Sequence, residues 1–151
     1  MMPLPPNLVE ADTVSTAFSG MHAQRIRMNV LANNVANVNT TRAADGSFAP
    51  YLRKEVIFRT QDIKPGQPYE QAVGVFGILE SRQPLRRIHD PEHPEAEADA
   101  KGYRFEPNIS LPLEMASVIE ASRAYEANLK TMKIASNSLK MTDSILEPVN
   151  V

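Results

Sequence analysis

The sequence predicts an α+β fold in which two long helices at the chain ends pack as a coiled-coil-like pair beside a small antiparallel β-rich middle domain. Residues 7–49 and 113–147 contain no proline, and both stretches carry apolar side chains at helical spacing. Between them, the prolines gather in residues 50–112, and the apolar residues there alternate with polar ones. Long helices at opposite ends of a 151-residue chain can bury their apolar stripes only on each other or on neighbouring chains. We therefore expect an assembly subunit rather than an enzyme, with no catalytic residue and no cofactor.

The N-terminal part is divided into a flexible segment, residues 1–11, and a helix, residues 12–38, that Asp12 or Thr13 can cap. The apolar face of this helix is wider than the seam of a two-stranded coiled coil, so it should contact more than one neighbour. Its two overlapping rows, broken at Arg25, are made up of Val14, Ala17, Phe18, Met21, Met28, Leu31, Ala32, Val35 and Val38. Gly20 costs the helix about 1 kcal/mol relative to alanine, which predicts that another segment packs closely there.

A polar stripe runs beside these rows, because Asn29, Asn33 and Asn37 recur at every fourth position. One interpretation is a helix end that passes into turns, since asparagine favours caps and loops. The other is that the amides form hydrogen bonds across helices and fix their axial register. Both can hold, with Asn29 and Asn33 in an interface and Asn37 at the cap.

Residues 39–106 are predicted to be a loop followed by the small β-rich domain. Strands are expected at residues 52–59, 73–79 and 103–105, where side chains alternate, and Pro65-Gly66 is a turn signal. We interpret them as one small antiparallel sheet that leans on the base of a helix, because a sheet of this size is marginal alone. Arg86-Arg87, next to the acidic loop 90–101, is interpreted as a salt-bridged turn.

The C-terminal helix is expected over residues 107–147, followed by a tail, residues 148–151. Its main apolar row advances in steps of three and four through Met115, Val118, Ser122, Tyr125, Leu129, Met132 and Leu139. Ile119, Ile134 and Met141 broaden that row, and alanines such as Ala121 and Ala135 permit close approach of another helix.

Composition excludes several functional classes. Sixteen basic and eighteen acidic residues give a net charge of −2, which predicts neither nucleic acid nor an anionic membrane as a partner. The absence of cysteine removes disulfides and thiolate sites. The N-terminus lacks the basic start and apolar core of a cleaved signal peptide, and no apolar run is long enough for membrane insertion.

One segment, residues 89–93, has metal-ligand chemistry, because His89 and His93 flank two carboxylates. Pro91 and Pro94 oppose the helix that would bring both imidazoles to one face. We expect a surface loop and no metal site, and we keep a metal-dependent hydrolase as the third functional hypothesis. On pattern alone, the stripes are also compatible with an intramolecular helical hairpin without an assembly role.

Four motifs give a more specific indication. Residues 19–29 (SGMHAQRIRMN) and 31–41 (LANNVANVNTT) closely resemble the N-terminal signature of bacterial flagellar rod and hook proteins. Residues 107–109 (PNI), 114–115 (EM) and 121–128 (ASRAYEAN) resemble the C-terminal signature of the same family. Residues 51–56 (YLRKEV) and 86–94 (RRIHDPEHP) are similar to the proximal rod proteins within it. The resemblance covers residues 13–146.

The resemblance implies a structural subunit of the basal-body rod, in which the terminal helices pack as layers of a tube that is both drive shaft and export channel. It implies export by the flagellar type III apparatus without signal cleavage, and a place in the rod within the periplasmic space. The implied partners are further copies of the chain, other rod proteins and the proteins at the membrane-ring/rod junction. A helical export chaperone or adaptor module remains the alternative.

We combine the helical rows with these motifs to predict a subunit interface. Its expected residues are Val14, Phe18, Met21, Arg25, Met28, Asn29, Leu31, Asn33, Val35, Asn37, Met115, Val118, Ser122, Tyr125, Asn128, Leu129, Met132 and Leu139.

Overall fold

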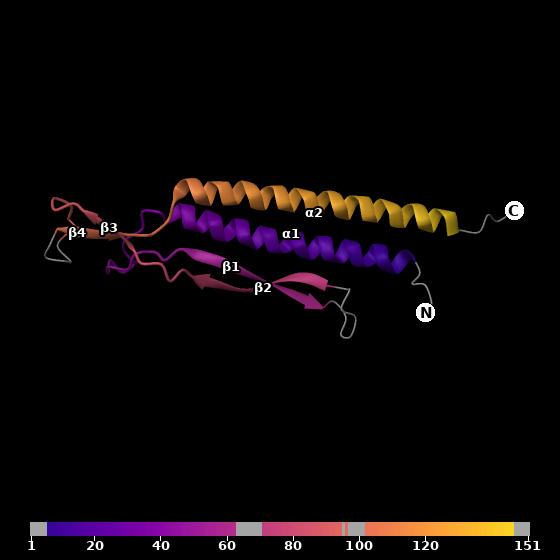
Figure 1. The fold of residues 1–151 in the computed structure, drawn as a ribbon, viewed down its shortest axis with the longest axis horizontal. Coiled ribbons are helices and arrows are strands. Elements are labelled where there is room, and N and C mark those ends of the chain that lie inside the picture. Colours follow the sequence, from indigo (N-terminus) through magenta and orange to yellow (C-terminus); the bar gives the residue numbers. More distant parts are fainter. Residues whose placement is uncertain (1–5, 63–70, 95, 97–101, 147–151) are drawn as a thin grey trace. The chain divides into compact units, whose positions relative to one another are not determined.

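The computed structural model describes residues 6–62, 71–94, 96 and 102–146, and it confirms the predicted α+β class (Figure 1). Along the chain, one long helix precedes and another follows a small β-rich middle region. In chain order the elements are α1 (Pro6–Ala36), β1 (Lys54–Asp62), β2 (Gln71–Glu80), β3 (Arg86–His89), β4 (Tyr103–Glu106) and α2 (Leu111–Leu146). The predicted turn at Pro65-Gly66 and the predicted tail, residues 148–151, lie outside the described residues.

Helix α1 starts earlier than the sequence suggested. It begins at Pro6 rather than near Asp12, so it includes part of the segment expected to be flexible. Proline suits the first helical turn, because its missing N–H would have no partner there. The helix ends at Ala36, where the backbone N–H of Asn37 donates to the carbonyl of Asn33 at 3.1 Å. The Asn37 side chain donates to the same carbonyl at 2.9 Å, which supports its predicted role at the cap.

Helix α2 begins at Leu111, four residues after the predicted start at Pro107, and is described to Leu146. Pro112 lies in its first turn, and the Glu114 N–H donates to the carbonyl of Ser110 at 3.0 Å. Glu114 is the acidic residue of that first turn, where a negative charge interacts favourably with the helix dipole.

The middle region contains two two-stranded antiparallel sheets, β1–β2 and β3–β4, instead of the single sheet we expected (Figure 1). The interpretation of Arg86-Arg87 as a turn was wrong, because both residues belong to strand β3. Cross-strand contacts stabilise this strand although it has few apolar residues. The Arg87 guanidinium lies 3.8 Å from the centre of the Tyr103 ring, and the His89 ring meets that of Tyr103 edge-on at 4.8 Å.

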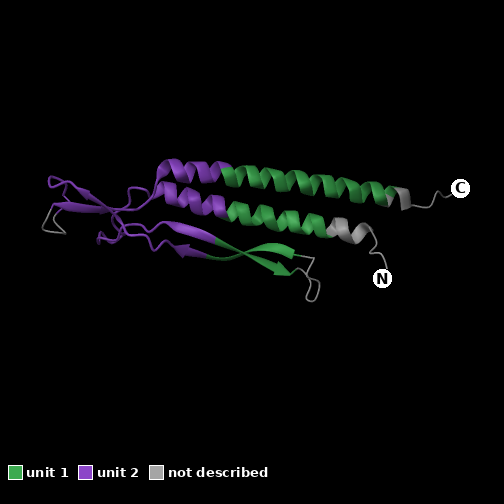
Figure 2. Cartoon of the chain, viewed as in Figure 1, with its two compact units in different colours: residues 1–26, 57–77, 120–151 green, residues 27–56, 78–119 purple. Residues whose placement is uncertain are grey.

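The chain divides into two compact units, and both helices pass from one to the other (Figure 2). Unit 1 comprises residues 1–26, 57–77 and 120–151, and unit 2 comprises residues 27–56 and 78–119.

In unit 1, α1 contacts the β1–β2 sheet through hydroxyl groups. The Thr16 hydroxyl donates to the carbonyl of Gln71, and the Ser19 hydroxyl accepts from the N–H of Val73, both at 3.1 Å. These two bonds join the helix to the backbone of strand β2. The buried side chains of α1 in this unit are Ala17, Met21 and Ala23.

In unit 2, the buried residues come from both helices and from the segment that precedes α2. They are Val30, Leu31, Asn34, Pro107, Ile109 and Glu114, together with Ala96. Asn34 and Glu114 are the largest fully buried side chains in the described part of the chain, and both are polar. These two side chains form a polar junction among the apolar residues that this unit buries.

Candidate assembly surfaces

The face of α2 that meets α1 is a row of small and polar residues. Glu114, Ala121, Asn128 and Ala135 are spaced by seven; Ala121 is completely buried, and Glu114 and Ala135 are nearly so. Within unit 2, Glu114 contacts Asn34. Within unit 1, a Cβ added to Gly20 would lie 2.7 Å from Asn128 Nδ2. We call these four residues the α2 seam, and its two alanines permit the close helix approach that the sequence predicted.

The apolar row predicted as the interface flanks this seam. Val118, Tyr125, Met132 and Leu139 are also spaced by seven, and each stands four residues after a member of the α2 seam. All four are half-buried, and Met115 of the same row is 55% exposed. The subunit thus buries three of the four residues of the α2 seam and covers Asn128 and the apolar flank only in part.

The eighteen predicted interface residues fall into three groups of burial. Met21 and Leu31 are buried within the subunit. The exposed residues are Phe18, Arg25, Asn29, Asn33 and Met115. The half-buried residues are Val14, Met28, Val35, Asn37, Val118, Ser122, Tyr125, Asn128, Leu129, Met132 and Leu139.

Four of these residues come together around one hollow in unit 1. Phe18, Met21 and Arg25 of α1 and Tyr125 of α2 line it, together with His22, which the prediction left out. The hollow is open to solvent and has about 300 Å³ of empty space. Phe18 is 63% exposed at its rim, although it is one of the largest apolar residues of the helix. Aromatic and sulfur-containing side chains around a cation are well suited to receive a side chain from another molecule.

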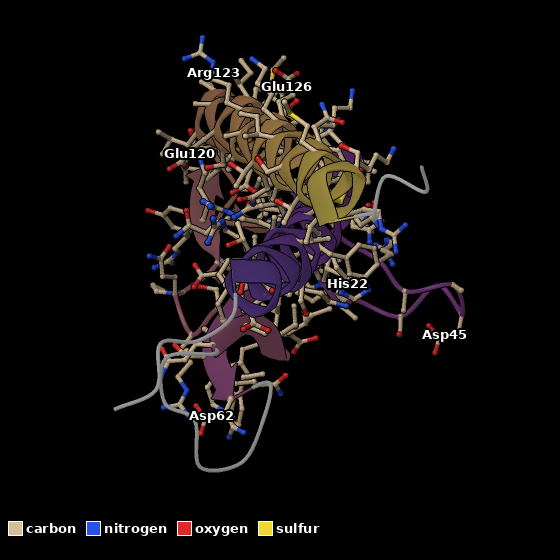
Figure 3. All side chains as sticks on the ribbon, turned by 90° about the vertical axis from the view of Figure 1, so that its right-hand side faces the viewer. His22, Asp45, Asp62, Glu120, Arg123 and Glu126 are labelled. Carbon is tan, nitrogen blue, oxygen red and sulfur yellow. The ribbon has the colours of Figure 1, made fainter. Side chains whose placement is uncertain are left out.

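The side of α2 away from α1 carries both charged and large apolar side chains (Figure 3). Figure 3, an end-on view, shows Arg123 and Glu126 projecting outward from α2, and His22 projecting from α1. Ile134 and Met141 are exposed by 68% and 67%, and they lie on the same side of α2 as Arg123, because they follow it by about three and five helical turns. The sequence noted these residues as broadening the row, but it did not place them in the predicted interface.

The polar junction of unit 2 was missed by the sequence reasoning. The Asn34 side chain lies between three segments and uses all of its hydrogen-bonding capacity. Its Nδ2 donates to the carbonyl of Lys54 at 2.9 Å and to Glu114 Oε2 at 3.1 Å. Its Oδ1 accepts from the N–H of Lys54 at 2.9 Å and from the Tyr51 hydroxyl at 3.1 Å. A signal was available, because Asn34 stands three and four residues after the apolar positions Leu31 and Val30.

The buried carboxylate of the junction is paired with a cation. Arg53 Nε donates to Glu114 Oε1 at 2.6 Å, and the same guanidinium bonds Glu55. Burial alone would lower the pKa of Arg53, but the hydrogen bond and the charge of Glu114, with a contribution from Glu55, raise it above the ordinary value. Burial also raises the pKa of Tyr51, and the charges of Glu80 and Glu114 add to that effect. Both carboxylate oxygens of Glu114 are thereby satisfied.

The histidine segment, residues 89–93, forms the end of a strand and a turn. His89 lies in strand β3 against Tyr103, and His93 follows in a turn where its N–H donates to the carbonyl of Asp90 at 3.2 Å. Among the described residues, no group of three or more histidine, aspartate or glutamate side chains is placed to hold a metal ion. No helix in the described ranges combines the length and apolarity needed to cross a lipid bilayer.

Comparison with known proteins identifies the family to which the chain belongs. Residues 15–43 match the family model described as flagella basal body rod protein, and residues 102–145 match that of the flagellar basal body rod FlgEFG protein C-terminal region. The flagellar basal-body rod protein FlgC of Borreliella burgdorferi is 35% identical over 148 residues, which covers 89% of this chain and 96% of that protein. FlgC of Salmonella typhimurium is 36% identical over 126 residues, with 83% and 90% covered.

Proposed function

Since the chain belongs to the FlgC family of flagellar basal-body rod proteins and is a structural subunit of that rod, we propose that it builds the proximal rod through its two terminal helices. In this proposal, the subunit reaches the periplasmic space through the flagellar type III apparatus without signal cleavage. It then joins further copies of itself, other rod proteins and the proteins at the membrane-ring/rod junction. The finished tube transmits torque and leaves a channel for later subunits, and no catalysis is involved.

The observation that carries the assembly mechanism is the hollow lined by Phe18, Met21, Arg25 and Tyr125. Phe18 is 63% exposed there, so most of its apolar surface is left for a neighbour to cover. Full burial of a side chain of this size contributes about 1.5–3 kcal/mol. In this proposal, the other exposed and half-buried residues of the predicted interface add contacts along both helices, whereas Leu31 is buried within the subunit.

Unit 1 has a second apolar surface, on a different side of α2 from the hollow. Ile134 and Met141 lie on a face of α2 different from that of Met132 and Leu139, because two residues along a helix correspond to a rotation of about 200°. Two different faces favour contacts with two different neighbours. Such heterologous contacts extend into open helical assemblies instead of closing into a dimer.

The test replaces Phe18 by a negatively charged residue. The variant gene is expressed in the native bacterium after its chromosomal copy of the gene has been deleted. Phe18→Glu should abolish swimming and leave basal bodies without a completed rod, because the hollow's occupant would lose its apolar contact. Export and the helical content of the purified subunit should remain, since Phe18 is mostly exposed.

Ala44→Glu is the matched control, because it adds the same charge at an exposed turn position that lies outside both helices and outside the proposed surfaces. It should leave swimming intact. Normal motility of the Phe18→Glu strain would overturn the proposed surface.

A further inference from the structure

We propose that Asn34, Glu114 and Arg53 set the axial register of α1 against α2, so that they are positioning residues rather than a source of stability. We call these three residues the register lock. The inference concerns the subunit itself and does not depend on the rod proposal.

The register can be stated in residue numbers. In unit 2, Asn34 contacts Glu114, and in unit 1, Gly20 lies against Asn128. The two residue numbers of each pair sum to 148. This is the relation expected of antiparallel helices, in which one residue number rises as the other falls. One alignment therefore describes the helix pairing in each unit.

The small side chains of the α2 seam discriminate poorly between alignments. Ala121 and Ala135 each carry only a methyl group, so a slip of one heptad leaves them little to clash with, whereas Asn128 opposite Gly20 is the one seam residue whose packing favours the native alignment. Such a slip moves one helix by roughly 10 Å along the other, because each residue rises 1.5 Å. Packing of the two alanines alone would therefore tolerate more than one register.

The register lock removes that tolerance. Asn34 is fixed on strand β1, because its amide bonds both the N–H and the carbonyl of Lys54, and only its remaining Nδ2 hydrogen reaches Glu114. After a slip of one heptad, the buried Glu114 would lose its bonds to Asn34 and Arg53 together. An unpaired buried carboxylate is strongly unfavourable, so only one alignment is allowed. A single buried polar residue specifies register in coiled coils in the same way.

The absence of cysteine makes the register directly measurable. Cysteine pairs are introduced into the full chain, and disulfide yields are compared under mild oxidation. The pair Gly20→Cys and Asn128→Cys reports the native register, since a Cβ at residue 20 would lie 3.2 Å from Asn128 Cγ. Arg27→Cys with Asn128→Cys reports a slip of one heptad in one direction. Thr13→Cys with Asn128→Cys reports the opposite slip.

With the register lock intact, the native pair should cross-link more than about tenfold better than either slipped pair, because each slip would break a buried ion pair. The pairs are then placed in a chain with an apolar junction, carrying Asn34→Leu, Arg53→Met and Glu114→Met. This chain should keep its helical content, because apolar residues of similar volume often replace a buried ion pair without loss of stability. Its three yields should converge to within about threefold.

The conservative variant Glu114→Gln should keep the native preference, because its amide oxygen still accepts from Arg53. Two results would overturn the proposal. An undiminished preference for the native pair in the apolar-junction chain would show that packing sets the register. Loss of helical content in that chain would show that the three residues supply stability rather than alignment.

Discussion

Asn34 shows at the scale of one residue how a single amide organises unit 2. Its two donors and two acceptor positions are all used, by Lys54, Glu114 and Tyr51. Three neighbouring asparagines, Asn29, Asn33 and Asn37, attracted the prediction because they repeat at every fourth position. Asn29 and Asn33 are exposed, and Asn37 caps α1. Spacing alone does not reveal which amide is buried, because that depends on where β1 crosses the helix.

The substitution Asn34→Asp should be severely destabilising. It removes both amide donors and places a second carboxylate beside the buried Glu114, so we expect a loss of about 3 kcal/mol or more in the free energy of unfolding. Urea unfolding followed by circular dichroism measures this value. Asn33→Asp makes the same change at an exposed neighbour and should stay within about 0.5 kcal/mol of the wild type. Equal stability of the two variants would contradict the described junction.

Tyr51 should make the folded state sensitive to alkaline pH. Its pKa is raised above the ordinary value of 10.0, so the folded state holds this proton more tightly than the unfolded state. The associated stabilisation is present in full below pH 10 and is lost as pH rises through the raised value. Tyr51→Phe should weaken this alkaline loss in unfolding titrations, at a cost of about 1 kcal/mol near neutral pH from the bond to Asn34.

Tyr125→Phe is the control for that titration, because it leaves Tyr51 in place and should keep the alkaline loss. An unchanged alkaline slope in Tyr51→Phe would exclude Tyr51 as the responsible group.

At the scale of the elements, the periodic segments were predictable and the irregular ones were not. Both helices follow from long proline-free stretches with apolar spacing, and β1, β2 and β4 from alternation. Strand β3 was missed because it holds Ile88 as its one aliphatic residue, and its pairing depends on contacts with the distant Tyr103. Of the α2 seam, the sequence indicated the close approach at Ala121 and Ala135 but missed Glu114, since a buried glutamate does not stand out in a helical apolar period.

The contact between Gly20 and Asn128 gives a prediction for helix pairing. A methyl group at Gly20 would meet Asn128 Nδ2 at 2.7 Å, so overpacking should cost about 1–3 kcal/mol and outweigh the roughly 1 kcal/mol gained in helix propensity. With Asn128→Ala, the methyl finds room, and Gly20→Ala should become stabilising. A double-mutant cycle in urea measures the coupling, which we expect to be about 1–2 kcal/mol.

Gly77→Ala is the control for that cycle, because nothing lies within 4 Å of a Cβ at this glycine. Its effect should be the same with and without Asn128. Zero coupling between Gly20 and Asn128 would mean that the two helices do not approach closely here.

At the scale of the whole molecule, the subunit buries most of the α2 seam and leaves large apolar side chains uncovered. Phe18, Met115, Ile119, Ile134 and Met141 are each more than half exposed. In this account, the α2 seam and the apolar side chains beside it have different roles. The register lock sets the alignment of the two helices, and the exposed apolar side chains offer contact area to neighbouring subunits. The sequence predicted the apolar rows, but separating the two roles required knowing which face of each helix the subunit itself buries.

The most direct test of this account is a density map of the assembled rod, resolved well enough to place side chains. We predict that neighbouring subunits contact Phe18 and the hollow around it, and that a different neighbour covers Ile134 and Met141. A map in which these side chains face solvent or the central channel without a contacting neighbour would contradict the account.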